Sequence, residues 1–486
     1  MANVLIIGGG VAGLSAGIYA CLNGYDTTIC EAHAIPGGCL TSWERQGYHI
    51  DNCIHWLTGT NKLNRDGLYS IWCDLNVLSP TVKLYQRNSL FTCYAEGKEL
   101  SLHRDLKKLE TQMLTLSPVD AKEIESFIRA VDTMMGIIGY GGSQREEKYG
   151  FWKIVPRIPL IKRYLDLTVS ELAERFHHPA LKSFFSSFMP DWFGSFALVF
   201  VAANFCSGNA DLPLGGSEAM AKRMTDRFVS LGGKMLCRKE VTQIHREGSK
   251  AIAVGFSDGT SLSTDWVIST IDPACLFRNI LDAPMPKKLE KMYRNEAFRR
   301  FSSFHVAFAC ELKELSFDGD YTIEIPEDFR AVLPARYLLV RHDSHEKGYA
   351  PDGKSLIQIL SYCDEETCRA FIHNRNEYKA HYDDWKQHIA EAEKALITSR
   401  FPELQAKLSC IDVWTPATYQ RYVHSDVGTF ESFALPKKFY PKMISPCIPG
   451  LDNVLLAGQW LQVHGGLPIA AMTGKAAVDE LCRRDR

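Results

Sequence analysis

The N-terminal segment carries the pattern that most constrains the fold of this chain. The apolar run Asn3–Ile7 predicts a strand buried on both faces of a sheet. Ala12–Asn23 fits a helix that ends at Gly24, and Asp26–Glu31 predicts a second strand. Together they form one βαβ unit, which is the building block of a Rossmann-like parallel sheet.

A glycine cluster joins the first predicted strand to the helix. Gly8 permits a tight turn, Gly10 allows the backbone to approach a pyrophosphate, and Gly13 lets the helix pack closely on the sheet. Val11 and Ala12 stand in the first helical turn, whose free N–H groups would face that anion. The spacing therefore predicts dinucleotide binding at this turn.

Two further features follow the second predicted strand. Glu31 closes that strand, and a carboxylate at this place accepts hydrogen bonds from both hydroxyls of an adenosine ribose. The pair Gly37 and Gly38 comes shortly afterwards. An acid followed by a glycine pair favours a flavin protein over a plain nicotinamide dehydrogenase, although the pair alone would be an ordinary turn.

Composition excludes several classes of protein. The chain has 486 residues, of which 46% are hydrophobic and 23% charged, and its formal net charge is −2. These values are typical of globular proteins of two to three domains and give no indication of nucleic-acid binding.

The 15 cysteines show no zinc or disulfide spacing, so we predict no metal site and reduced thiols. We expect a cytoplasmic protein, because no signal peptide is evident and the apolar stretch Trp192–Phe205 is too short to span a bilayer.

The chain is predicted to leave the nucleotide domain and to return to it. Helical patterns dominate from about Asn61 to Asp211, for example at Ser117–Met135 and Thr168–Phe176. The fold class is α/β, with a Rossmann-like FAD-binding domain and a discontinuous α+β substrate domain. We assign residues 1–60, 211–271 and 411–486 to the first domain, and residues 61–210 and 272–410 to the substrate or lid domain. Later predicted elements are a helix at Ala219–Leu231, strands at Lys239–Arg246, Ala251–Phe256, Asp265–Thr270, Ser303–Cys310 and Leu356–Tyr362, a helix at Tyr382–Ile397, a strand at Asn453–Ala457 and a C-terminal helix that reaches Cys482.

The segment Glu31–Thr60 (EAHAIPGGCLTSWERQGYHIDNCIHWLTGT) resembles the phytoene desaturase, carotenoid isomerase and retinol saturase group. This group belongs to the wider monoamine-oxidase-like FAD superfamily. Matching segments follow in order at Leu214–Ser217, around Val241 with Asp265–Ile268, and at Leu455–Ala477 (LLAGQWLQVHGGLPIAAMTGKAA). The region between them resembles nothing closely enough to name a substrate.

The resemblance implies FAD as the cofactor and assigns several contacts to it. Val241 would present its backbone to the adenine, while Gly466 and Leu467 would lie near the pyrimidine edge of the flavin. Gly458 and Gln459 would lie near the pyrophosphate and ribityl groups. The family often has Arg where this chain has Cys39, and Asp where it has Gln459, so these two contacts lack the charge usual in the family.

Two histidines are candidates for catalysis. His55 follows a predicted strand that the family directs toward the flavin, and it could donate or accept a proton. His464 could also face the flavin. A purely structural role stays open for both.

The predicted function is redox chemistry at a carbon–carbon bond of a hydrophobic substrate such as a polyene, isoprenoid or steroid. Desaturation, saturation and flavin-assisted isomerisation are all open. A flavin amine oxidase and a noncatalytic FAD-binding protein are the alternatives. No electron partner is assigned.

Two segments have both a functional and a structural interpretation. Tyr149–Leu165 interleaves bases with apolar residues, which suits peripheral contact with a membrane surface or a segment packed on the core. Lys182–Phe205 is rich in Phe, Val and Ala and has few charges, so it suits either an apolar substrate cavity or a domain core.

Overall fold

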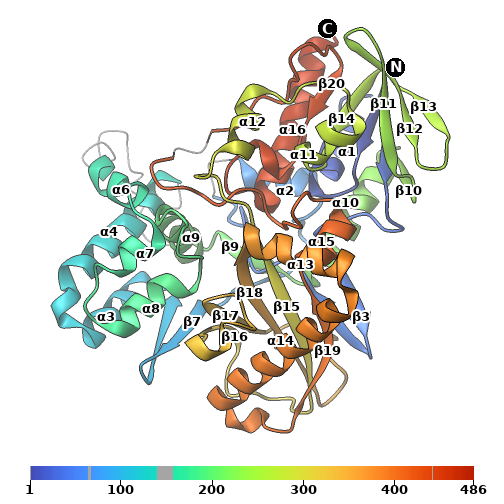
Figure 1. Cartoon of the computed structure of the whole chain (residues 1–486). Helices are drawn as coiled ribbons and strands as arrows, with labels where there is room; N and C mark the ends of the chain where they lie inside the picture. The colour runs from blue at the N-terminus through green and yellow to red at the C-terminus, as the bar shows by residue number, and fades with distance from the viewer. Residues whose placement is uncertain (1, 64–66, 139–156, 440–441) are drawn as a thin grey trace.

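The computed structural model describes residues 2–63, 67–138, 157–439 and 442–486. Figure 1 shows one part of the chain with both termini at one end, a second sheet with its helices at the other end, and a cluster of helices at the side.

A five-stranded parallel sheet contains the N-terminal βαβ unit, in the order β10-β2-β1-β14-β20. β1 is central because its apolar residues pair on both sides, with Ile6 opposite Ile29 in one neighbour and Ile268 in the other. The strands predicted at Asn3–Ile7 and Asp26–Glu31 are confirmed. The sheet consists of β1 (Asn3–Ile7), β2 (Asp26–Glu31), β10 (Lys234–Cys237), β14 (Trp266–Ser269) and β20 (Val454–Leu456).

Three helices pack together beside this sheet: α1 (Val11–Leu22), α10 (Gly216–Ser230) and α16 (Gly466–Arg484). α1 and α16 approach each other very closely. A Cβ atom on Gly474 would stand 2.5 Å from the carbonyl oxygen of Ala12. The C-terminal helix is therefore an integral part of the layer that contains the N-terminal βαβ unit, although it lies at the far end of the sequence (Figure 1).

A small antiparallel sheet follows β10 in the chain. It consists of β11 (Val241–Glu247), β12 (Lys250–Phe256) and β13 (Ser261–Ser263). β12 and β13 are joined by a turn that contains Gly259, which has a φ of +78°. The sequence pattern missed β13, because its three residues are exposed and include two serines.

A seven-stranded sheet unites the two insertions, in the order β19-β15-β18-β17-β16-β7-β8. The expectation that helices dominate between residues 61 and 211 was incomplete, because β7 and β8 come from this region. β7 pairs with β16 of the later insertion on one side and with β8 on the other. The predicted domain boundary at residue 411 falls inside β19, while the division into two domains stays a prediction. The strands are β7 (Ser89–Ala95), β8 (Lys98–His103), β15 (Phe301–Cys310), β16 (Gly319–Glu324), β17 (Tyr337–His342), β18 (Ser355–Asp364) and β19 (Leu408–Trp414).

The helical cluster at the side of Figure 1 packs around an aromatic core. Phe185 contacts Phe127, Phe176 and Phe184, and Phe184 stacks on Phe91 of β7. Most of the apolar stretch predicted as cavity or core thus belongs to the core. The helices are α3 (Leu106–Leu116), α4 (Ala121–Ile137), α6 (Ile158–Leu165), α7 (Val169–Ala173), α8 (Pro179–Ser187) and α9 (Phe196–Cys206).

The segment predicted to contact membranes lies partly outside the described residues, namely at 149–156. Its remainder includes α6, where Lys162 pairs with Asp166 and Arg163 pairs with Glu123. Membrane contact stays a prediction. Among the described residues, the helices lack either the length or the apolar character needed to cross a bilayer.

The remaining elements connect and cover these layers. β3 and β4 form a hairpin, and β9 joins β5 and β6 in a short three-stranded sheet. Their bounds are β3 (Ser42–Arg45), β4 (Tyr48–Asp51), β5 (Leu57–Thr58), β6 (Leu84–Tyr85), β9 (Ala210–Pro213), α2 (Leu68–Asp74), α11 (Pro273–Cys275), α12 (Lys287–Arg294), α13 (Glu365–Glu377), α14 (Lys379–Arg400) and α15 (Pro416–Val423).

Candidate functional site

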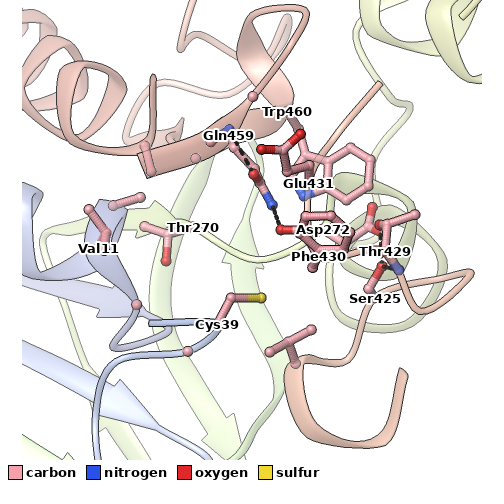
Figure 2. Close-up of a pocket in the computed structure, with 18 of the residues that line it drawn as sticks. Val11, Cys39, Thr270, Asp272, Ser425, Thr429, Phe430, Glu431, Gln459 and Trp460 are labelled. Carbon is pink, nitrogen blue, oxygen red and sulfur yellow. Dashed lines mark hydrogen bonds between the residues drawn. The ribbon is translucent and has the colours of Figure 1, made fainter. Parts of the chain in front are cut away.

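A cavity of about 970 Å³ runs from the carboxyl ends of β1 and β2 to the surface of α9. Figure 2 shows its central part, bounded by Val11 and Thr270 on one side and by Glu431, Gln459 and Trp460 on the other. The cavity brings together nearly all of the predicted site residues, which come from distant parts of the chain. Those that line it are Gly8, Gly10, Val11, Ala12, Glu31, Gly37, Gly38, His55, Val241, Gly458, Gln459, His464, Gly466 and Leu467.

Gly13 is the one predicted site residue that does not line the cavity. A Cβ atom on Gly13 would stand 1.9 Å from the carbonyl oxygen of Gly8. Gly8 itself has a φ of +98°, which favours glycine. These two residues shape the turn, whereas the space above Gly10 is open, since its Cβ would meet no atom closer than 3.8 Å.

The N-terminus of α1 opens into this cavity. Its N-cap residue is Gly10, no side chain caps it, and its first turn carries no acid. The second glycine pair is held beside it, because Gly37 N–H donates to the carbonyl of Gly9 at 2.9 Å. Uncapped N–H groups and the helix dipole make this turn suitable for a phosphate group.

Glu31 lines the same end of the cavity. Its carboxylate accepts hydrogen bonds from Gly9 N–H at 2.7 Å and His33 N–H at 2.8 Å. Each carboxylate oxygen has a second lone pair, so both can still accept from a ligand. The His33 ring stacks on Tyr422 at 4.0 Å between ring centroids and lines the same wall. This stacked pair was not anticipated from the sequence, because its members lie 389 positions apart.

The N-terminus of α16 opens on the cavity from another side. Gln459 connects it to a neighbouring loop: its Oε1 accepts from Gly466 N–H at 3.0 Å, and its Nε2 donates to the carbonyl of Phe430 at 3.0 Å. Both functional groups of Gln459 therefore hold the backbone, with one N–H and one lone pair to spare. Cys39 lines the cavity near this point as a neutral thiol, since burial raises its pKa to about 12.

The end of the cavity beside α9 is apolar. Trp56 comes from the loop after β4, Phe196 and Phe200 lie one turn apart on α9, and Tyr362 and Phe430 are stacked. None of the side chains of this set carries a charge at neutral pH. We call it the apolar half of the cavity, and its lining is Trp56, Phe196, Ala197, Phe200, Val201, Leu360, Tyr362, Phe430 and Leu435.

The two candidate catalytic histidines both face the cavity as neutral rings. Burial, followed by the charge of Arg341, holds the pKa of His55 well below its ordinary value. Burial lowers the pKa of His464 to about 4, and its Nδ1 has no hydrogen-bond partner among the described residues. Neither ring therefore carries a charge near pH 7, although both can exchange hydrogen bonds with a ligand.

A buried charge cluster holds the loop that carries His55. Arg341 donates to the carbonyl of Ile54 and pairs with Asp343 at 2.7 Å, while Arg87 pairs with Asp343 at 2.8 Å and with Asp320 at 3.1 Å. Burial alone would raise the pKa of Asp343, but Arg341 and Arg87 lower it to about 2. These buried ion pairs, together with the bond from Arg341 to Ile54, thus hold the loop in place.

Glu431 faces the cavity where the apolar half begins, and sequence reasoning missed it. Its carboxyl has no hydrogen bond or ion pair among the described residues, and burial raises its pKa to about 7. Nothing in the local sequence GTFESF marks it, because only the fold brings it to the start of α16.

The sequence profile described as flavin containing amine oxidoreductase matches residues 11–482. The chain belongs to this family. FAD is accordingly its cofactor, as predicted, and the site fits FAD: an uncapped helix N-terminus, an open space above Gly10 and an acid at the end of β2 lie in one cavity.

Curated relatives of this flavoprotein have low sequence identity to it, but their matches extend over more than half of each chain. Prolycopene isomerase 1, chloroplastic, of an Oncidium hybrid cultivar is 22% identical over 452 residues, covering 88% of this chain and 75% of the relative. 4,4′-Diaponeurosporene oxygenase of Staphylococcus haemolyticus is 21% identical over 514 residues, covering 99% and 97%. Phytoene desaturase (neurosporene-forming) of Rhodobacter capsulatus is 24% identical over 292 residues, covering 58% and 54%.

Solved structures show the same fold. An oxidoreductase of Methanosarcina mazei matches with a TM-score of 0.62 at 15% identity, covering 99% of this chain and all of that chain. Cyclohexylamine oxidase of Brevibacterium oxydans matches with a TM-score of 0.60 at 14% identity, covering both chains fully. These matches show the fold of this flavoprotein, while the sequence profile shows its family.

Proposed function

We propose that this flavoprotein oxidises, reduces or isomerises a carbon–carbon bond of an apolar substrate. The observation that carries the proposal is the apolar half of the cavity. It is continuous with the part of the cavity formed by the start of α1, Glu31 and the start of α16, which we call the FAD cradle. Apolar walls favour ligands that themselves leave water, by about 25 cal/mol per Å² of buried apolar surface. The carotenoid names of several relatives agree with a substrate of this kind.

The geometry of the cavity supports one placement of FAD. The N-terminus of α1 would hold the pyrophosphate, and Glu31 would accept from the ribose hydroxyls. Val241 would contact the adenine. Gly466 and Leu467, at the start of α16, would lie beside the flavin ring, where the helix dipole stabilises negative charge.

The reaction requires little chemistry from the side chains. Bound FAD would accept or deliver a hydride. Phe196 and Phe200 would hold the substrate and exclude water, and His55 would supply a hydrogen bond from its neutral ring. The cluster around Arg341 would keep His55 in place.

The test uses anaerobic FAD-loaded protein and two panels of compounds. One panel contains polyenes, enones and steroids, and the other contains primary and secondary amines. We expect a change in flavin absorbance with members of the first panel, either reduction of oxidised FAD or reoxidation of dithionite-reduced FAD. Reduction by amines alone, with no response to any apolar compound in either redox state, would replace this proposal with a flavin amine oxidase.

Replacement of Glu31 tests the assignment of the ribose site. Glu31→Ala should weaken FAD binding by about tenfold or more, because each lost bond to a charged acceptor contributes about 1.5–3 kcal/mol. Flavin titration of apoprotein measures the change. Glu240→Ala is a matched control, since it removes a carboxylate from the same end of the cavity. Equal affinity in wild type and Glu31→Ala would show that the ribose lies elsewhere.

Replacement of His55 separates catalysis from cofactor binding. His55→Ala should retain FAD but slow flavin reduction by substrate about 100-fold, the usual size of a lost proton-transfer or hydrogen-bonding contribution. Flavin content and single-turnover rates are both measured. Rates equal to those of wild type would leave His55 with a structural role.

A further inference from the structure

Glu431 is a carboxyl group in the cavity wall that no basic side chain among the described residues neutralises. Most buried acids of the molecule have a role: Asp343 pairs with two arginines, and Asp272 accepts from Tyr293 and two backbone N–H groups. Glu431, in contrast, has no bonding partner among the described residues, although it comes from the loop that packs under α16. An unpartnered acid in such a place needs a reason beyond stability.

The position of Glu431 is close to the start of α16. A Cβ atom on Gly466 would stand 3.6 Å from its Oε1. Figure 2 shows the carboxyl beside Gln459 and Trp460, on the side of the cavity away from Val11. With the pyrophosphate at the start of α1 and the ribose at Glu31, the flavin end of an extended FAD would run toward this side, where Glu431 lines the cavity.

The groups that face Glu431 are neutral. Cys39, Cys53 and Tyr362 are the titratable groups whose pKa values its charge raises, and burial already raises all three above their ordinary values. His464, in the loop that leads into α16, has a pKa of about 4 and is uncharged at pH 7. With no base opposite it among the described residues, the carboxyl responds freely to any charge placed in the cavity.

We propose that Glu431 is the proton-exchanging residue of the redox site, taking up one proton when the bound FAD is reduced and releasing it on reoxidation. Two electrons bring negative charge into a water-poor site, and that charge increases the proton affinity of a nearby carboxylate. Two electrons and one proton then reside on FAD, and a second proton from solvent resides on Glu431. The pKa of about 7 places this exchange in the neutral range.

The inference rests on the placement of FAD in the proposed function but not on the identity of the substrate. Within that function, Glu431 would hold the proton that leaves or joins the second carbon when a hydride moves at the first. Flavin content reports on the placement, the substrate panels report on the function, and the measurement below reports on Glu431.

The test is the reduction potential of bound FAD as a function of pH, measured with dithionite and a reference dye in the full-length protein. Wild type should show a steeper fall of potential through the neutral range than Glu431→Gln, by up to about 30 mV per pH unit, since each additional proton in a two-electron couple contributes that slope. Glu431→Asp should restore part of the slope, because it keeps the carboxyl. Glu240→Gln removes a carboxylate from the end of the cavity beside Glu31; it is the control and should follow wild type.

Identical slopes in wild type and Glu431→Gln at all pH values would overturn the inference. If Glu431→Gln binds FAD poorly, the comparison of Glu431→Asp with wild type decides it, because a shorter carboxyl must shift the pH at which the slope changes. A role in packing alone predicts altered thermal stability with no change in the pH dependence of the potential.

Discussion

Gly10→Leu should yield a folded protein that is free of FAD. Gly10 has a φ of −73°, which any residue adopts, and a Cβ there would meet no atom closer than 3.8 Å. The added side chain therefore costs the fold little but points into the space above the N-terminus of α1, where the pyrophosphate would lie. Absorption spectra of the purified protein measure the bound flavin, and circular dichroism verifies the fold.

Two glycine substitutions serve as matched controls for this experiment. Gly10→Ala should retain part of the FAD, because a methyl group fills less of the space. Gly13→Ala should instead destabilise the protein, since its Cβ would stand 1.9 Å from the carbonyl oxygen of Gly8. Full FAD occupancy in Gly10→Leu would mean that the pyrophosphate binds elsewhere.

Arg341→Met should lower the free energy of unfolding by about 3–5 kcal/mol, the cost of leaving a buried ion without its partner. Arg341 is 5% exposed and lies between Asp343 and Asp320, which would retain only Arg87. The variant also loses the hydrogen bond to the carbonyl of Ile54, so the loop of His55 should become less ordered. Thermal and urea denaturation measure the loss of stability.

An exposed pair provides the control for the charge cluster. Lys222 and Asp226 form an ion pair on the surface of α10, and Lys222→Met should cost less than about 1 kcal/mol. If Arg341→Met loses no more stability than Lys222→Met, water must replace the lost ion pairs of the cluster, and the cluster is then hydrated.

The N-terminal βαβ unit could be predicted from the sequence because its signals are local. β1 is an apolar run, Gly8 and Gly13 serve the turn, and Glu31 ends a strand within the same short segment. The C-terminal helix was predictable for the same reason, since a glycine pair marks its start. The local sequence pattern was therefore enough to predict α1 and α16, the two helices whose N-termini form the FAD cradle.

The residues that depend on long-range contacts could not be predicted. β7 is stabilised by pairing with β16, more than 200 positions later in the chain, and its own burial pattern does not alternate. The apolar half combines Trp56, α9 and Tyr362 from three regions of the chain. Glu431 has an unremarkable sequence context and gains its position only when its loop packs under α16.

The central claim is that the redox end of FAD meets the apolar half of this cavity beside Glu431. A crystal structure of the FAD-loaded protein tests it most directly. We expect density for the ribose at Glu31, the pyrophosphate at the start of α1, and the flavin ring between the start of α16 and the aromatic side chains of Trp56 and Phe196. Density for the flavin ring outside this space, or an apolar half closed off from the ring by protein, would contradict the account.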